Sequence, residues 1–209
     1  MINEISLKDK KILLRVDYNV PIKDSIITDD YRIIKSVPTI NYCLERGASV
    51  TIMSHLGRPD KYDKKYSLYP ILEKLEKILG KNIIFSEDCI SNKSFMNSSK
   101  LKKGEIHLLE NLRFYDGEIS NCSDFSRNLS FHGDVFINDA FGTAHRSHAS
   151  NVGVTKFFDE KSMGFLMEKE LKYLSKEIKK PERPLIIIMG GAKIKGKIEL
   201  IENFLDISD

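Results

Sequence analysis

Short apolar runs alternate with helix-length amphipathic stretches along most of the chain, and this rhythm constrains the fold more than any other feature. The segments KILLRVD (11–17) and ASVTIMS (48–54) have the length of buried strands. The segment LYPILEKLEKILG (68–80) has apolar residues at helical spacing and ends on Gly80, a typical helix stop. Strands that alternate with helices predict a parallel sheet covered on both faces.

The other expected elements continue this pattern. Further strands are predicted at 82–85, 105–110 and 134–141, and helices at 31–47 and 123–131. The first of these helices contains Pro38, a residue that kinks helices. The sequence therefore predicts an α/β fold, specifically a three-layer Rossmann-like domain with a mostly parallel sheet.

The C-terminal part of the chain differs in composition. Residues 159–180 are predicted to form one long charged helix, and PERP (181–184) ends it. The apolar run Leu185–Met189 then begins a new strand–helix unit. We therefore expect a first domain at 1–161, an interdomain helix at 162–180 and the start of a second domain at 181–209.

Charge and cysteine usage exclude several classes of protein. The 209 residues include 33 basic and 30 acidic side chains, a net charge of +3 that argues against a nucleic-acid binder. The apolar runs are far too short to span a bilayer, and the N-terminus lacks the layout of a signal peptide. Three widely spaced cysteines (Cys43, Cys89 and Cys122) favour a reduced, cytoplasmic setting without a disulfide framework.

Cationic and polar side chains follow the predicted strands. Ligands of parallel sheets bind beyond the carboxyl ends of the strands, so these positions should share one rim. The rim residues are Asp17, Asn19, His55, Arg58, Arg113 and Arg146, with Arg32 at the start of the first helix. Guanidinium groups match phosphate and carboxylate oxygens, so their convergence predicts a site for a small, multiply charged anion.

Simpler interpretations exist for each residue taken alone. A single arginine after a strand is usually a solvated surface residue, and Asp17 and Asn19 could be turn-formers before Pro21. The spacing of His145 and His148 would suit a metal pair on a helix, but no third ligand is evident nearby, so no metal site is predicted.

A glycine–lysine stretch near the C-terminus resembles a nucleotide-triphosphate P-loop. Gly191, Gly196 and Lys197 fit most of the G-x-x-x-x-G-K-[ST] pattern. The last position is Ile198, which has no hydroxyl to place on Mg²⁺. A genuine P-loop is therefore the least favoured interpretation.

Several motifs, in this order, resemble the phosphoglycerate kinase family. The matching stretches are LRVDYNVP, SHLGRP, LLENLRF, INDAFGTAHRSHAS, GFLMEKEL and MGGAKIKGKI, which together run from Leu14 to Ile198. The resemblance implies reversible phosphoryl transfer between 1,3-bisphosphoglycerate and ADP, giving 3-phosphoglycerate and ATP. It also implies that this chain has about half of the family's length, with the first domain and only the start of the nucleotide domain.

The resemblance assigns roles to the rim. Asp17 and Asn19 would bind the carboxylate side and hydroxyl of the glycerate, and Arg32 would stabilise the transferring phosphoryl group together with Lys193. The residues expected to hold the phosphate that is not transferred, as a charge clamp, are His55, Arg58, Arg113 and Arg146. The substrate-binding loop would also include Leu56 and Gly57.

The glycine–lysine stretch becomes the family's nucleotide loop. The residues expected to approach Mg²⁺-bound ADP or ATP are Gly190, Gly191, Ala192, Lys193 and Lys197, and the metal ligand would lie outside this chain. Two departures from the family pattern stand out. Ile194, Lys195 and Gly196 replace the usual Val-Ser-Asp, which puts nucleotide affinity in doubt, and Tyr18 replaces the usual Phe.

The resemblance implies a cytoplasmic, monomeric phosphotransferase with small-molecule substrates and no nucleic-acid or membrane partner. The isolated chain is expected to bind 3-phosphoglycerate weakly and to turn over negligibly. The alternatives are a non-catalytic phosphoglycerate-binding module and a nucleic-acid binder that uses the arginine rim.

Overall fold

The computed structural model describes residues 1–177, 181–190, 198–205 and 207–209. These residues form two compact units, Met1–Glu168 and Lys169–Asp209. Within the described residues, no helix is both long and apolar enough to cross a membrane.

The first unit is built on a six-stranded sheet. Its strands are β1 (Lys11–Arg15), β4 (Ser49–Met53), β5 (Ile83–Ser86), β6 (Ile106–Leu109), β7 (Val135–Asn138) and β8 (Lys161–Met163). They pair in parallel in the order β5-β6-β4-β1-β7-β8. A separate antiparallel hairpin joins β2 (Ile22–Lys23) to β3 (Ile26–Ile27). The predicted α/β fold with a parallel sheet is confirmed.

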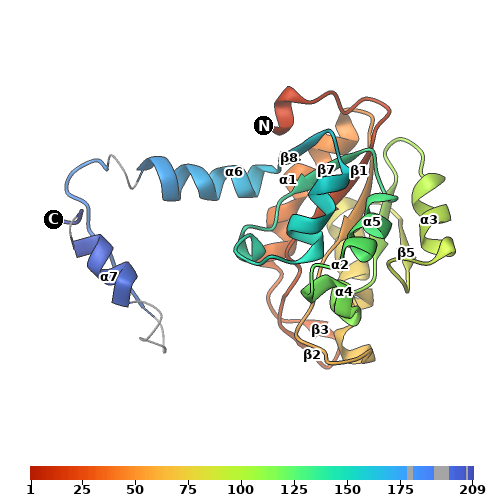
Figure 1. The fold of residues 1–209 in the computed structure, drawn as a ribbon, viewed down its shortest axis with the longest axis horizontal. Helices are drawn as coiled ribbons and strands as arrows, with labels where there is room; N and C mark the ends of the chain where they lie inside the picture. The colour runs from red at the N-terminus through yellow and green to blue at the C-terminus, as the bar shows by residue number, and fades with distance from the viewer. Residues whose placement is uncertain (178–180, 191–197, 206) are drawn as a thin grey trace. The chain divides into compact units, whose positions relative to one another are not determined.

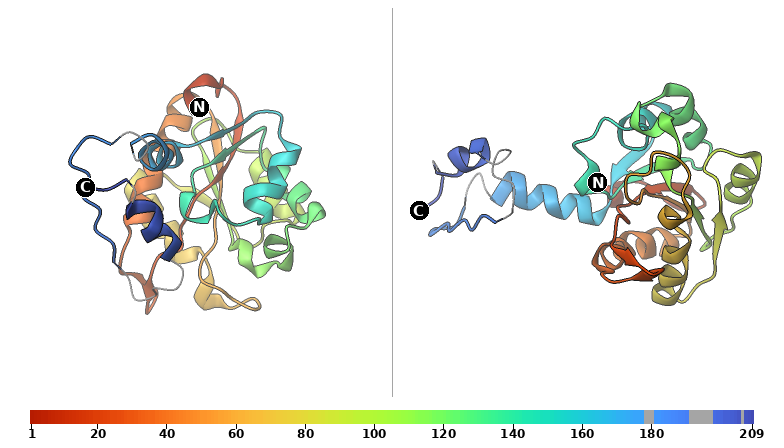
Figure 2. Two further views of the ribbon diagram at one scale, coloured as in Figure 1. Left: turned by 60° about the vertical axis from the view of Figure 1, so that its left-hand side comes forward. Right: turned by 90° about the horizontal axis from the view of Figure 1, so that it is seen from below.

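Helices lie on both faces of this sheet (Figures 1 and 2). The described α-helices of the first unit are α1 (Tyr31–Glu45), α2 (Tyr69–Leu79), α3 (Asn92–Ser99), α4 (Asp116–Ile119) and α5 (Ser123–Ser130). Helix α6 (Phe165–Leu171) begins in the first unit and ends in the second, and α7 (Ile198–Leu205) belongs to the second unit. Short 3₁₀ or π turns are η1 (Ile2–Glu4), η2 (Lys64–Tyr66), η3 (Leu112–Phe114), η4 (Phe141–Thr143), η5 (Ala149–Gly153), η6 (Val154–Phe157) and η7 (Lys172–Glu177).

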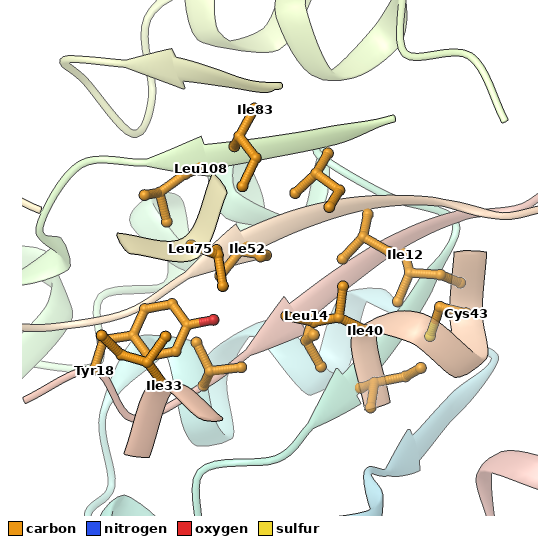
Figure 3. Packing of buried hydrophobic residues seen from close by; sticks show 14 of the residues in the cluster. Ile12, Leu14, Tyr18, Ile33, Ile40, Cys43, Ile52, Leu75, Ile83 and Leu108 are labelled. Carbon is orange, nitrogen blue, oxygen red and sulfur yellow. The ribbon is translucent and has the colours of Figure 1, made fainter. Parts of the chain in front are cut away.

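Alternation along β1 divides the core into two parts. Successive side chains of a strand point to opposite faces of the sheet. Ile12 and Leu14 therefore pack in the cluster that includes Ile33 and Ile40 of α1 (Figure 3), whereas Leu13 packs in the cluster on the other face, beside α5. Arg15, two residues after Leu13, consequently lies on the α5 face although it is charged.

The helices predicted at 31–47, 68–80 and 123–131 are present as α1, α2 and α5, and Pro38 lies inside α1. Helix α3 was not expected because its sequence, NKSFMNSS, is mostly polar. It begins at a cap, since the Ser91 hydroxyl accepts a hydrogen bond from the Ser94 N–H at 3.2 Å.

The long helix predicted at 159–180 is wrong at its start. Lys161–Met163 forms β8 and pairs with β7, so the boundary predicted at residue 161 falls inside a strand. The helix α6 begins at Phe165, where the buried Asp139 carboxylate accepts a hydrogen bond from the Met167 N–H at 3.0 Å. A carboxylate at a helix N-terminus satisfies backbone donors that have no partner within the helix.

The strand predicted at Leu185–Met189 is also absent from the described structure. These residues have no regular secondary structure, and their unit contains no second strand among its described residues. An apolar run needs a neighbouring strand to satisfy its backbone groups, so the pattern alone does not make a ladder. The helix that was expected to follow is present as α7.

Candidate functional site

Three arginines line a single cavity beyond the carboxyl ends of the strands. Arg58 follows β4, Arg113 follows β6 and Arg146 follows β7, and all three border a space of about 510 Å³. The remaining lining residues are Pro59, Asp60, Ile119, His145 and His148. The convergence predicted from the sequence is therefore present, with guanidinium groups from three separate loops around one space.

Arg113 is the most constrained of the three. Its side chain is buried, Nη1 donates to the Gly57 carbonyl, and Nε has no hydrogen-bond partner in the described structure. Burial, together with the positive charges of Arg146, Arg15 and Arg58, lowers the pKa of Arg113 to about 10. The surroundings of Arg113 thus disfavour its positive charge, and a bound anion would relieve this repulsion.

A second group of contacts joins the end of β1 to α1 and to the loop after β4. Arg32 Nη1 lies 2.6 Å from Asp17 Oδ2, and the Asn19 N–H donates to Asp17 Oδ1 at 3.1 Å. Asn19 Oδ1 accepts a hydrogen bond from the Gly57 N–H at 2.9 Å. The side-chain oxygens of Asp17 and Asn19 are therefore already engaged, and the amide NH₂ of Asn19 is left as a donor.

His55 does not join the clamp as a cation. The ring is buried, and its Nδ1 lies 3.1 Å from Arg15 Nη2. Burial and the nearby charges of Arg15, Arg113, Arg146 and His148 lower the pKa of His55 far below its ordinary value. The lowered pKa and the contact with Arg15 therefore favour a neutral hydrogen-bonding role for His55 over the cationic role that the resemblance implied.

Sequence reasoning missed the buried charges behind the cleft. Arg15 Nε donates to the Ser150 hydroxyl at 2.9 Å, and that hydroxyl donates to Glu118 Oε1 at 2.6 Å. Both charged side chains are almost completely buried. A signal was present in KILLRVD, because a charge inside a strand that is covered on both faces needs a partner.

The substrate-binding loop predicted around Leu56 is held by an asparagine that was also missed. Asn111, at the start of η3, accepts the Leu56 N–H at 3.2 Å and the Arg113 N–H at 3.0 Å through Oδ1. Its Nδ2 donates to the Leu56 carbonyl at 2.8 Å. Leu56 is buried, so it anchors the loop by packing and through its backbone.

Gly57 occupies a position that only glycine fits. Its φ is +63°, and a Cβ atom there would overlap the Tyr66 ring. Gly80, at the end of α2, provides a matched control because its φ is +62° but an added Cβ would meet nothing within 4 Å.

We expect Gly57→Ala to lower the free energy of unfolding by at least about 1 kcal/mol more than Gly80→Ala, which carries only the backbone strain of about 1–2 kcal/mol. Urea denaturation of both variants measures this difference. Equal losses would show that the Tyr66 ring moves aside at little cost.

Tyr18, the departure from the family's usual Phe, has a partner for its hydroxyl. Tyr18 is fully buried, and its hydroxyl lies 2.9 Å from Ser36 Oγ. The Ser36 hydroxyl donates to the Ile33 carbonyl at 2.8 Å, so Tyr18 is the donor in this pair. Burial raises the pKa of Tyr18, which keeps the hydroxyl protonated.

The predicted nucleotide-binding residues fall mostly outside the described residues, namely Gly191, Ala192, Lys193 and Lys197. At Gly190, which is described, an added Cβ would meet no atom of the described residues within 4 Å. Within the described residues, no group of three His, Cys, Asp or Glu side chains could hold a metal ion, His145 and His148 included.

Comparison with known proteins gives a consistent result. The family model described as phosphoglycerate kinase matches residues 2–209. The phosphoglycerate kinase of Akkermansia muciniphila is 44% identical over 209 residues, which is 100% of this chain and 52% of that protein. The phosphoglycerate kinase of Borrelia garinii is 47% identical over 205 residues, which is 98% of this chain and 52% of that protein. The chain therefore spans about half the length of the curated relatives it matches.

Solved structures agree with the sequence comparison. A crystal structure of phosphoglycerate kinase from Pyrococcus horikoshii matches with a TM-score of 0.90 and 35% identity, covering 100% of this chain and 53% of that one. The structure of phosphoglycerate kinase from Coxiella burnetii matches with a TM-score of 0.87 and 36% identity, covering 100% and 52%. With the family model, the identities and the fold in agreement, this chain belongs to the phosphoglycerate kinase family.

Proposed function

We propose that this chain supplies the phosphoglycerate-binding part of a phosphoglycerate kinase. The reaction is reversible phosphoryl transfer between 1,3-bisphosphoglycerate and ADP, which gives 3-phosphoglycerate and ATP. The observation that carries the proposal is the convergence of Arg58, Arg113 and Arg146 on one cavity of about 510 Å³. Such a site matches an anion that is small and carries several charges.

The three arginines hold the phosphate that is not transferred. A guanidinium group offers paired donors in a fixed plane, so groups from three loops surround a phosphate from several sides. The lowered pKa of Arg113 supports this role, because the cation is disfavoured by its neighbours until an anion compensates them.

The residues beside the clamp orient the glycerate. The Asn19 amide NH₂ provides a neutral donor, the backbone N–H groups of Leu56 and Gly57 hold the loop on Asn111 and Asn19, and Asp17 pairs with Arg32. A hydrogen bond from a neutral donor depends on its direction, so such donors fix where a hydroxyl or carboxylate oxygen lies. Attraction between charges alone does not fix this position. His55 belongs to this neutral group.

Arg32 acts on the phosphoryl group that moves. Its side chain is half-exposed, with a carboxylate partner on one side only, so it can turn to a ligand. Phosphoryl transfer depends on positioning and on neutralising the charge that spreads over the phosphoryl oxygens. We assign the same role to Lys193. The second substrate would be ADP or ATP bound to Mg²⁺, and the metal ion would add further charge neutralisation. Residues 190–197 would approach this nucleotide.

The proposed organisation is a first domain that includes β8, where the sequence placed the boundary at 161, then a linking helix that begins at Phe165 instead of 162, and the start of the nucleotide domain at 181–209. Substrates on facing domains must meet, so the proposed reaction requires closure of the complete enzyme. The proposal also includes a monomeric enzyme of the cytoplasm that binds neither nucleic acid nor membranes.

A titration of the purified chain with 3-phosphoglycerate, followed by backbone NMR, tests the proposal. We expect weak, saturable shifts at Gly57, Arg58, Arg113 and Arg146, and negligible turnover in a coupled assay. Short single-stranded DNA is the competing ligand. Shifts with DNA that 3-phosphoglycerate does not displace would favour the nucleic-acid alternative, and an absence of shifts with 3-phosphoglycerate would contradict the proposal.

A further inference from the structure

A buried arginine lies behind the cleft and contacts a histidine of the site. Arg15, at the end of β1, is 1% exposed, and His55, two residues after β4, is 2% exposed. We propose that Arg15 is a positioning residue that holds His55 as the neutral tautomer with its proton on Nε2, and that Glu118 is the counter-ion that makes this possible. The consequence for ligand binding rests on the proposed function.

The contact between the two side chains determines the tautomer. Arg15 Nη2 lies 3.1 Å from His55 Nδ1. A guanidinium group has only donors, so Nδ1 must be the acceptor and must carry no proton. A neutral imidazole with an unprotonated Nδ1 has its proton on Nε2. His55 is therefore a donor through Nε2 and not through Nδ1.

The guanidinium group of Arg15 cannot rotate away from this contact without losing others. Its Nε donates to Ser150 Oγ at 2.9 Å, and its Nη1 donates to the Val16 carbonyl. Three nitrogens thus have partners on three different segments of the chain. A planar group fixed at three points presents Nη2 to His55 in one direction.

Glu118 on α4 neutralises the buried arginine. Its Oε1 accepts the Ser150 hydroxyl at 2.6 Å, and its Oε2 accepts the Ser150 N–H at 2.9 Å. His148 Nδ1 lies 3.5 Å from Oε1. Burial acts to raise the pKa of Glu118, but the contacts with His148, Arg15 and Ser150 together outweigh burial. The net effect lowers the pKa, so the carboxylate stays charged.

Burial and four neighbouring cationic groups oppose a second proton on His55. Burial and the charges of Arg15, Arg113, Arg146 and His148 lower its pKa, and they outweigh Asp17, whose Oδ1 is 4.0 Å from Nδ1 and already engaged. A proton on Nδ1 would face the guanidinium group directly. His55 should therefore offer one neutral donor, through Nε2, over the whole physiological range.

Long-range proton–nitrogen NMR of the whole chain with labelled histidine tests the tautomer without a ligand. For His55 we expect a protonated Nε2 and an unprotonated Nδ1, unchanged from about pH 5.5 to about pH 8. A proton on Nδ1, or a titration near the ordinary pKa of histidine, would overturn the inference. This readout does not depend on the proposed function.

Variants connect the tautomer to binding. Arg15→Met should give a mixture of His55 tautomers and lower the affinity for 3-phosphoglycerate about tenfold. Ser150→Ala removes only the hydroxyl between Arg15 and Glu118, so it keeps the test decisive if Arg15→Met does not fold. It should change the His55 tautomer and the affinity for 3-phosphoglycerate in the same direction as Arg15→Met. Arg127→Met, on the exposed surface of α5, is the control.

The outcomes separate the two proposals. The expected tautomer without binding of 3-phosphoglycerate would contradict the proposed function and leave the role of Arg15 intact. Binding with an unchanged tautomer in both variants would contradict the role of Arg15 and leave the proposed function intact.

Discussion

Replacing Arg113 by methionine is expected to lower the affinity for 3-phosphoglycerate about 100-fold, because hydrogen bonds to a charged group contribute about 1.5–3 kcal/mol and each 1.4 kcal/mol is a tenfold change. The same substitution should change the free energy of unfolding by no more than about 1 kcal/mol. The reason is that burial and the charges of Arg146, Arg15 and Arg58 already disfavour this cation in the free protein. Function and stability should therefore respond differently to one change.

Calorimetric titration and urea denaturation measure the two effects. Arg113→Lys keeps the charge but loses the planar pair of donors, so its affinity should lie between those of the wild type and the methionine variant. Arg127→Met, outside the cleft, should change neither quantity. A methionine variant that binds as tightly as the wild type would contradict the clamp.

Acid is expected to destabilise the chain through two buried histidines on the α5 face of the sheet. His107 on β6 and His132 after α5 are both fully buried. Their Nδ1 atoms lie 2.8 Å and 2.6 Å from Ser98 Oγ, and His132 Nε2 lies 2.7 Å from the Cys89 carbonyl. Each ring is hydrogen-bonded at both nitrogens, since His107 Nε2 lies 2.8 Å from Ser86 Oγ.

The direction of the effect follows from the pKa values. Burial lowers the pKa of His107 to about 3 and that of His132 to about 4. The unfolded chain has ordinary histidines, so it binds more protons than the folded chain below about pH 6.5. The contribution of these histidines to the free energy of unfolding is therefore fully present above this pH. It is lost as the pH falls toward their pKa values in the folded chain. From about pH 7.5 to about pH 5 these two histidines should contribute a loss of roughly 4 kcal/mol, about half from each, and the buried His55, whose pKa is also lowered far below its ordinary value, should add a further loss.

Urea denaturation at the two pH values measures this difference. His132→Gln should reduce the loss between the two pH values by roughly 2 kcal/mol, whatever its effect on absolute stability. The exposed His145 provides the control, because His145→Gln should leave the difference unchanged. If His132→Gln behaves like His145→Gln, then His132 accepts a proton in the folded chain and the hydrogen-bonded pair does not resist acid.

The order of elements was predictable from the sequence because local periodicity reports it. Strands β1 and β4 and helices α1 and α2 have the apolar spacing that burial requires, and the parallel sheet follows from their alternation. The position of Arg58, Arg113 and Arg146 after separate strands was enough to predict one rim, since parallel strands bring their carboxyl ends to the same edge.

The failures of prediction occurred where a partner far along the chain decides the outcome. Lys161–Met163 reads as part of a charged helix but is a strand because β7 offers it a free edge. Leu185–Met189 reads as a strand, but its described unit offers it no neighbour. Pairing is a property of two segments, and a single segment does not encode it.

By itself the sequence determined the class of fold, the edge of the sheet where the three arginines gather and the positive charge of that edge, because these depend on local pattern and residue type. Only the tertiary structure decided the contact between Arg15 and His55, the burial of Arg15 and Glu118 around Ser150, and the engagement of Asp17 with Arg32. These properties depend on distances of a few ångströms between residues that lie up to 135 positions apart, as Arg15 and Ser150 do. Burial excludes water, which would otherwise weaken the hydrogen bonds and charge interactions at these distances.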